Sequence, residues 1–181
     1  MLDSSSDAKV AFDMSIKDAE HLLEYCNSLG HPLPQKAEVF KRAGLVMALT
    51  AWETYVEDRA REGVQRRVSR EGSYAERFMQ ARLEEELKRF HNPNAEKTRK
   101  LFVDYLEVDV TVAWSWQHYD PVKAREKLDV LVKKRGDAVH RSTGRPAGPP
   151  LPHLVTKEDL EKAIRFLRAL VIATDKALID R

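Results

Sequence analysis

The segment QKAEVFKRAGLVMALTAWETYVEDRAREGVQRRVS, residues 35–69, decides the fold, because its apolar residues return every three or four positions along the segment. This spacing places them in one stripe along an α-helix. The stripe consists of Val39, Ala43, Val46, Leu49, Val56, Ala60 and Val64. A stripe of this length has to be covered by other helices, so we predict that residues 35–69 form the central scaffold.

The segments on both sides carry similar periodicity and are bounded by helix start and stop signals. Gly30 ends the pattern before the scaffold, and Asp120-Pro121 combines an N-cap acid with a proline at the first helical position. Thr156 and Asp159 have the spacing of a capping box. The predicted helices cover residues 7–29, 35–69, 74–90, 95–106 and 120–141, with a last one starting near 156. We therefore predict an all-α, up-and-down helical bundle of about five to six helices.

Two stretches are less regular. The apolar positions of the helix predicted at 74–90 stand among many charges: Phe78, Leu83, Leu87 and Phe90. Residues 107–119 partly alternate as a strand does, but a lone strand has no partner in an all-α chain. We expect an irregular connection or a short helical turn there. It would pack Trp114 and Trp116, either as core anchors or as stacking partners for a base or ligand.

Length and composition bound the remaining possibilities. A chain of 181 residues fits a single domain, in which we take 1–34 as an N-terminal helix with a linker and 35–181 as the main bundle. Cys26 is the only cysteine, so an internal disulfide and a cysteine metal cluster are excluded. The six histidines form no HExxH pattern and there is no glycine-rich phosphate loop, so we expect no metal and no cofactor.

The formal net charge of +2 indicates no class of partner by itself. The start MLDSSSDAKV lacks the order of a secretion signal, and no apolar run approaches the roughly 18 residues that span a bilayer. We therefore expect a cytoplasmic protein that has no contact with a membrane.

Arg135 is the first anomaly. At 100° per residue, it lies at the centre of an apolar stripe on the helix predicted at 120–141. The apolar residues within about 60° of it are Leu128, Leu131, Val132, Ala138 and Val139. Burying an unpaired guanidinium costs several kcal/mol. Arg135 therefore either extends along the edge of the core to water, or faces a cleft or subunit interface where it meets an anion.

His140 lies about 140° further round the same helix, so the two side chains would flank one groove without stacking. A histidine there is either a surface or capping residue or a catalyst. Residues 121–145 contain eight basic and three acidic residues, which fits a phosphate-binding strip or a solvated helix face.

Glu53 is the second anomaly, because it interrupts the stripe of the central helix. A buried carboxylate needs a partner, and Arg135 or His140 would supply one. Such a contact would orient the basic residue for chemistry or would be a purely structural ion pair.

These features together resemble a known family. The segment KKRGDAVHR, residues 133–141, looks like the Arg-x4-6-His motif of HEPN domains. ALTAWETYVEDRARE at 48–62, HNPNAEKTRKLF at 91–102 and VTKEDL at 155–160 resemble the RiboL-PSP-HEPN branch, and the similarity extends from about Lys36 onward. The chain departs from the family after the arginine, where Asn is common and Gly136 stands here, with Asp137 as a candidate substitute.

The resemblance implies a metal-independent endoribonuclease of toxin or phage-defence systems, with two copies of the motif across a homodimer. His140 would move a proton and Arg135 would stabilise the charged phosphorane-like transition state. Lys133, Lys134 and Arg141 would hold the RNA backbone, while Asp137 and Glu53 would support the site. An antitoxin or sensor protein is a candidate partner. The alternative is a non-catalytic HEPN-like module that binds RNA or dimerises.

Overall fold

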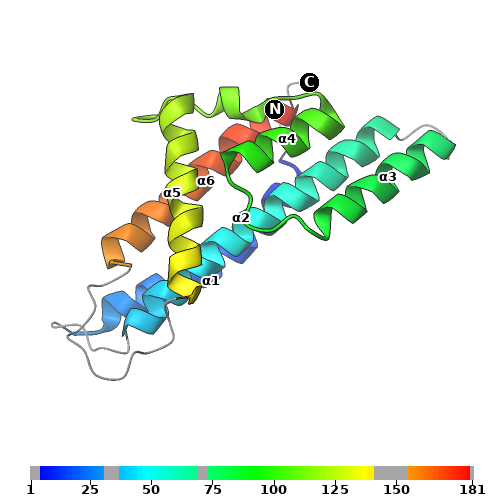
Figure 1. Cartoon of the computed structure of the whole chain (residues 1–181). Helices are drawn as coiled ribbons and strands as arrows, with labels where there is room; N and C mark the ends of the chain where they lie inside the picture. The colour runs from blue at the N-terminus through cyan, green and yellow to red at the C-terminus, as the bar shows by residue number, and fades with distance from the viewer. Residues whose placement is uncertain (1–4, 31–36, 69–72, 141–154, 180–181) are drawn as a thin grey trace.

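The computed structural model of the chain describes residues 5–30, 37–68, 73–140 and 155–179. Over these residues the chain forms six α-helices and one 3-10 helix, which confirms the predicted all-α fold class (Figure 1). In chain order the elements are α1 (Asp7–Ser28), α2 (Ala37–Val68), α3 (Tyr74–Leu87), α4 (Ala95–Leu106), η1 (Val110–Ala113), α5 (Pro121–His140) and α6 (Lys157–Ile179). No helix in these ranges is long and apolar enough to cross a membrane.

Side-chain caps set the starts of the last two helices, as the sequence predicts. Asp120 accepts a hydrogen bond at 2.9 Å from the backbone N–H of Lys123, in the first turn of α5. Thr156 and Asp159 cap each other's backbone N–H groups at 3.1 and 3.0 Å, which is a reciprocal capping box at the start of α6. Each cap satisfies donors that have no partner within the helix itself.

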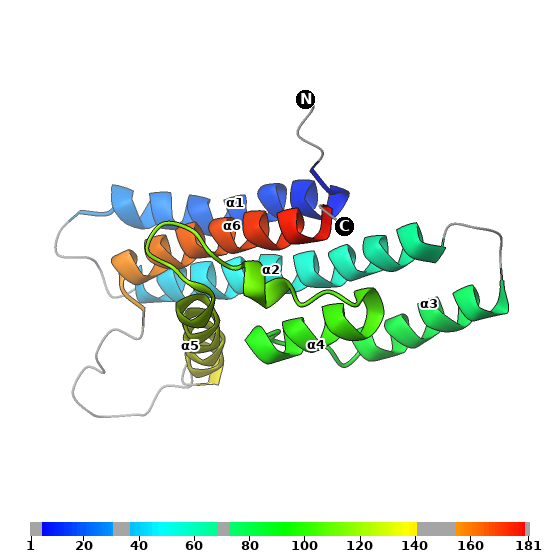
Figure 2. The same cartoon turned by 90° about the horizontal axis from the view of Figure 1, so that it is seen from above.

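The central helix α2 is covered on two sides. Figure 2 shows α1, α2 and α6 side by side, with α3 and α4 along the side of α2 away from α1. Helix α5 runs across this layer and is seen end-on in the same view. It contacts α2, α4 and η1, so it brings residues of the second half of the chain against the middle of the scaffold.

Trp114 and Trp116 anchor the segment around η1. The Trp114 ring lies edge-on to Trp52 at 6.3 Å, and its Nε1 donates to Thr174 Oγ1 at 2.9 Å in the core. Trp116 is half-buried and packs on Phe166 at 5.6 Å. Residues 107–119 are thus a connection with one short helical turn, as predicted. Both tryptophans act as core anchors, which is one of the two roles predicted for them.

The start of α1 is tied to the rest of the bundle by a buried polar cluster. The backbone N–H and hydroxyl of Ser6 donate to the carboxylate of Asp175 at 3.3 and 2.5 Å. The same carboxylate accepts a hydrogen bond from Arg59 Nε at 2.8 Å. This cluster joins α1, α2 and α6. The division of the chain into an N-terminal part, 1–34, and a main bundle, 35–181, stays a prediction.

Two predicted apolar positions on α2 and α3 are exposed in the structure. Val39 is 55% exposed, because the buried face at this end of α2 consists instead of Ala37, Lys41 and Leu45. Phe78 is 56% exposed, whereas Leu83 on the same helix is buried, so only the C-terminal half of α3 packs on the core. Periodicity identifies an apolar face but does not determine what covers it.

Candidate functional site

The guanidinium of Arg135 on α5 is held by three side chains from two other parts of the fold. Its Nη1 donates to Glu53 Oε2 on α2 at 2.8 Å and also to Asn92 Oδ1. Its Nη2 donates to Thr50 Oγ1 at 3.3 Å. The Arg135 and Glu53 side chains are only 18% and 15% exposed. The predicted contact between Glu53 and a basic residue of this helix is therefore confirmed, and that residue is Arg135.

The second half of the site is the HNPN segment, residues 91–94, which lies between α3 and α4. Asn92 has a positive φ of 52°, and its backbone N–H donates to Glu53 Oε2 at 3.0 Å. The carbonyl of Pro93 accepts a hydrogen bond from Trp52 Nε1 at 3.0 Å in the core. Trp52 and Glu53 are adjacent in sequence, and together they hold this segment against α2.

Asp129 on α5 secures the far end of the same segment, because its Oδ1 accepts from the backbone N–H of Ala95 at 2.9 Å. The segment therefore contacts both α2 and α5. The sequence indicates Asn92-Pro93-Asn94 only as the end of a helix, and no local pattern there reveals a contact with Arg135, which lies 43 residues away.

His91 is a second group that the sequence analysis did not select. Its Nδ1 lies 3.6 Å from Glu53 Oε1, a distance that makes an ion pair when the imidazole is protonated. Its side chain is 69% exposed, so the remainder of the ring is open to solvent. Glu53 therefore has Arg135 at one carboxylate oxygen and His91 at the other.

The pKa of Glu57, one turn further along α2, is affected by the charge of Glu53. Burial raises the pKa of Glu57, and the negative charges of Glu53 and Asp58 raise it further, against the opposing effect of Arg61 and His91. Glu57, which lies one turn from Glu53, thus keeps its proton to a higher pH than an isolated glutamate does. The site combines a guanidinium, an imidazole and carboxylates on three segments.

The other residues selected from the sequence are placed only in part. His140 is the last residue of α5, but its side chain lies outside the described part of the structure, as does Arg141. Lys133 is exposed on α5 and Asp137 is half-buried on the same helix.

Lys134 forms an ion pair with Asp159 at 2.6 Å and so ties α5 to the start of α6. Burial alone would raise the pKa of Asp159, but hydrogen bonds from Lys134 and from the backbone of Thr156 lower it below its ordinary value. The carboxylate therefore stays charged and holds Lys134 at neutral pH.

Arg135 retains capacity to bind an anion. A guanidinium carries five N–H donors, and the three contacts leave the Nε–H and one Nη2–H without a partner among the described residues. Two such donors match the oxygens of a phosphate or carboxylate. In the same part of the chain, no group of three His, Cys, Asp or Glu side chains is arranged to hold a metal ion.

Comparison with known proteins agrees with the resemblance seen in the sequence. No curated protein and no solved structure matches the chain. A sequence model of the RiboL-PSP-HEPN family matches residues 14–180, from the middle of α1 to beyond the end of α6. This match spans nearly the whole chain and every element described above except the first part of α1, so the protein belongs to the RiboL-PSP-HEPN family.

Proposed function

We propose that the protein is a metal-independent endoribonuclease of the toxin or phage-defence type. The observation that carries this proposal is the guanidinium of Arg135, which is fixed by Glu53, Asn92 and Thr50 and has two donors without a partner among the residues that the structure describes. It lies on the helix that ends at His140, within a family whose domains include many ribonucleases.

In the proposed reaction, the 2′-hydroxyl of a ribose attacks the adjacent phosphorus. The 2′-oxygen–phosphorus bond forms, the bond to the 5′-oxygen breaks, and a 2′,3′-cyclic phosphate and a 5′-hydroxyl result. The 2′-hydroxyl loses a proton and the 5′-oxygen gains one; His140 makes one of these two transfers and solvent water makes the other. The free donors of Arg135 stabilise the additional negative charge on the phosphoryl oxygens.

The remaining residues have supporting roles in this proposal. Glu53 orients Arg135, and Asp137 takes the polar role next to the motif arginine. Lys133, Lys134 and Arg141 hold the RNA backbone, with Lys134 also engaged by Asp159. The site is completed in a homodimer, where a second copy presents its own motif, and a cytoplasmic antitoxin or sensor protein restrains it.

One observation favours the alternative, a non-catalytic module that binds RNA or dimerises. Three of the five donors of Arg135 are used within the fold, and Glu53 neutralises its charge. An ion pair of this kind also serves simply to lock α5 and the HNPN segment onto α2.

Incubation of a mixed RNA pool with the purified protein and EDTA distinguishes the two functions. We expect fragments with 2′,3′-cyclic phosphate ends from wild type, and their loss in Arg135→Ala and His140→Ala. His91→Ala shows whether the second imidazole also moves a proton, and His21→Ala, an exposed histidine on α1, is the matched control. Intact RNA with wild type, or unchanged cleavage by Arg135→Ala, would overturn the nuclease proposal.

Dimer formation is tested separately by light scattering after size-exclusion chromatography. We expect the mass of two chains. A monomer at all concentrations that still cleaves RNA would refute the shared site.

A further inference from the structure

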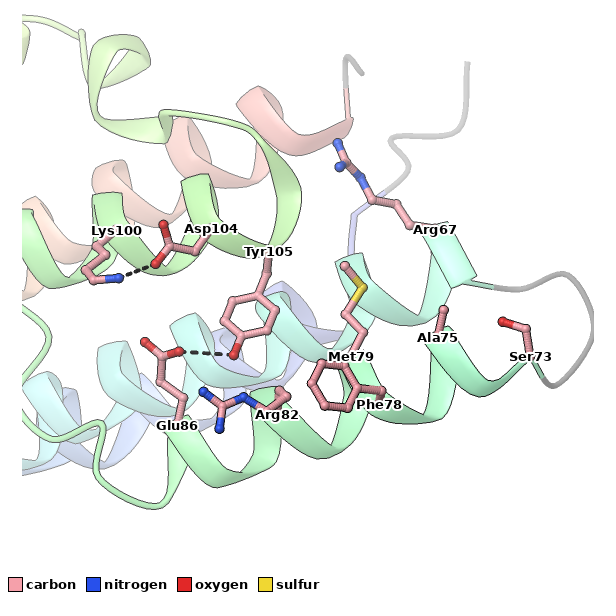
Figure 3. Close-up of a pocket in the computed structure, with 10 residues that line it drawn as sticks. All are labelled: Arg67, Ser73, Ala75, Phe78, Met79, Arg82, Glu86, Lys100, Asp104 and Tyr105. Carbon is pink, nitrogen blue, oxygen red and sulfur yellow. Dashed lines mark hydrogen bonds and ion pairs between the residues drawn. The ribbon is translucent and has the colours of Figure 1, made fainter.

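A groove separates α3 from α4 on the part of the molecule next to the HNPN segment. Its larger section is a cavity of about 780 Å³ between the end of α2 and these two helices (Figure 3). A second cavity of about 510 Å³ continues it, and the two share Arg82, Glu86 and Lys100 in their walls. We call both cavities together the α3–α4 groove.

Aromatic rings are exposed at the outer end of this groove. Phe78 lines it and is 56% exposed, although the apolar pattern of α3 predicts a buried residue there. Tyr74 stacks on Phe78 at 6.3 Å and is 78% exposed. Tyr105 faces the groove from α4, where its hydroxyl donates to Glu86 at 3.0 Å (Figure 3). Flat, partly exposed rings of this kind provide a surface on which nucleobases stack.

The charges of the groove favour an anionic occupant. Five basic side chains and three acidic ones line its two cavities. All three acids are already engaged, since Asp104 pairs with Lys100, Glu86 accepts from Tyr105 and Glu85 pairs with Lys88. Arg82 and Arg89 are exposed, and neither has a side-chain partner among the described residues. These two guanidinium groups are therefore available for phosphates.

The inner end of the groove leads to the candidate site. Phe90 and Lys97 line the second cavity, and the ammonium of Lys97 donates to the backbone carbonyl of His91 at 2.7 Å. His91 in turn contacts Glu53, the carboxylate that holds Arg135. The second cavity is therefore connected to the Arg135 guanidinium through the contacts of Lys97 with His91 and of His91 with Glu53.

We propose that the α3–α4 groove binds single-stranded RNA and directs the strand to Arg135. The proposal rests on the nuclease or RNA-binding function proposed above and identifies where its substrate lies. Bases stack on Phe78 and its neighbouring ring, while Arg82 and Arg89 contact the phosphates of the same strand. A groove with exposed rings at its outer end and cations in its walls suits a flexible strand of any sequence, because every base has an aromatic face.

The test measures the binding of a 2′-O-methyl oligonucleotide of about 12 nucleotides, which cannot undergo the cleavage reaction, by fluorescence anisotropy. Phe78→Ala removes a stacking ring and is expected to weaken binding about tenfold without changing its salt dependence. Arg82→Gln is expected to reduce the slope of log affinity against log salt by about 0.7, the value for one phosphate contact on a single strand.

Matched controls come from the opposite layer of the fold. Tyr25→Ala on α1 removes an aromatic ring that is 46% exposed, and Arg165→Gln on α6 removes a cation whose side chain is 67% exposed. Neither control is expected to change affinity or salt slope. Thermal melts of all four variants check that the fold is retained.

The outcomes separate this proposal from the proposed nuclease activity. If wild type cleaves RNA but Phe78→Ala and Arg82→Gln bind the oligonucleotide as wild type does, the groove proposal is overturned and the nuclease stands. If the groove variants lose affinity but wild type leaves RNA intact, the groove proposal is supported and the nuclease is overturned. Absence of binding even at about 50 mM salt overturns the groove as an RNA site.

Discussion

Replacement of Glu53 by alanine tests the central contact of the candidate site. The carboxylate accepts two hydrogen bonds, from Arg135 Nη1 at 2.8 Å and from the backbone N–H of Asn92 at 3.0 Å. Hydrogen bonds to charged groups contribute about 1.5–3 kcal/mol each. Because both partners keep some exposure and regain water in the variant, we expect a loss of about 3 kcal/mol of unfolding free energy, the lower end of the sum of the two bonds.

Replacement of Arg135 by methionine, which keeps the aliphatic part of the side chain, is expected to cost less. Glu53 then still accepts from the Asn92 amide, so the loss is about 2 kcal/mol. The double variant loses the shared contact only once. We therefore expect a coupling energy of about 1.5 kcal/mol between the two positions.

Urea unfolding followed by circular dichroism measures all four proteins of this cycle. For a chain of this size, 3 kcal/mol corresponds to a fall in Tm of about 6–12 °C, which a thermal melt checks independently. The exposed pair of Arg165 and Glu161 on α6, at 3.7 Å, is the control cycle, with a coupling below about 0.5 kcal/mol. Additive losses for Glu53 and Arg135, or a larger loss for Arg135→Met than for Glu53→Ala, would refute the reasoning.

Three further predictions concern other parts of the fold. Gly136→Ala is expected to raise the unfolding free energy by about 0.5–1 kcal/mol, because the added Cβ meets nothing within 4 Å. Gly63→Ala is expected to lower it by about 1–3 kcal/mol, because the added Cβ clashes with the buried Leu106. Thermal melts that shift in the same direction would contradict this contrast. Asp159→Asn is expected to cost about 1 kcal/mol at neutral pH. The pKa of Asp159 is lower in the folded protein than its unfolded value of about 3.9, so the carboxylate stabilises the fold above that value and stops doing so as pH falls through the folded pKa. The unfolding free energies of wild type and Asp159→Asn, measured by urea titration, should therefore converge as pH is lowered. A difference that grows on acidification would show that the charge of Asp159 is not the cause. Trp52→Phe removes the donor to the Pro93 carbonyl, and we expect it to lower the unfolding free energy by about 1–3 kcal/mol and to accelerate hydrogen exchange at the Asn92 amide. Unchanged exchange at that amide would show that the Trp52 hydrogen bond does not hold the HNPN segment.

The helices of this protein are predictable from the sequence to within a few residues, because their signals are local. The predicted range 95–106 coincides with α4, and Asp120 and Thr156 cap the helices that their positions indicate. The pairing of Glu53 with Arg135 was also within reach of sequence reasoning. A carboxylate and a guanidinium that each interrupt an apolar stripe both need a partner in a low-dielectric interior.

The other contacts of the site depend on the tertiary structure. Asn92 and His91 carry no periodic signal, and they reach Arg135 and Glu53 only because α5 crosses α2 next to the turn between α3 and α4. The exposure of Phe78 and the groove beside it depend equally on where α3 leaves the core.

The amino-acid sequence by itself thus determined the helices, their caps and the family, because hydrogen bonds between residues three or four apart and the periodicity of apolar side chains are properties of short segments. Only the tertiary structure decided that α2 and the HNPN segment together surround the Arg135 guanidinium. The contacts of Arg135 with Asn92 and Thr50 join residues 43 and 85 positions apart, and such separations are closed by the packing of whole helices and leave no trace in local periodicity.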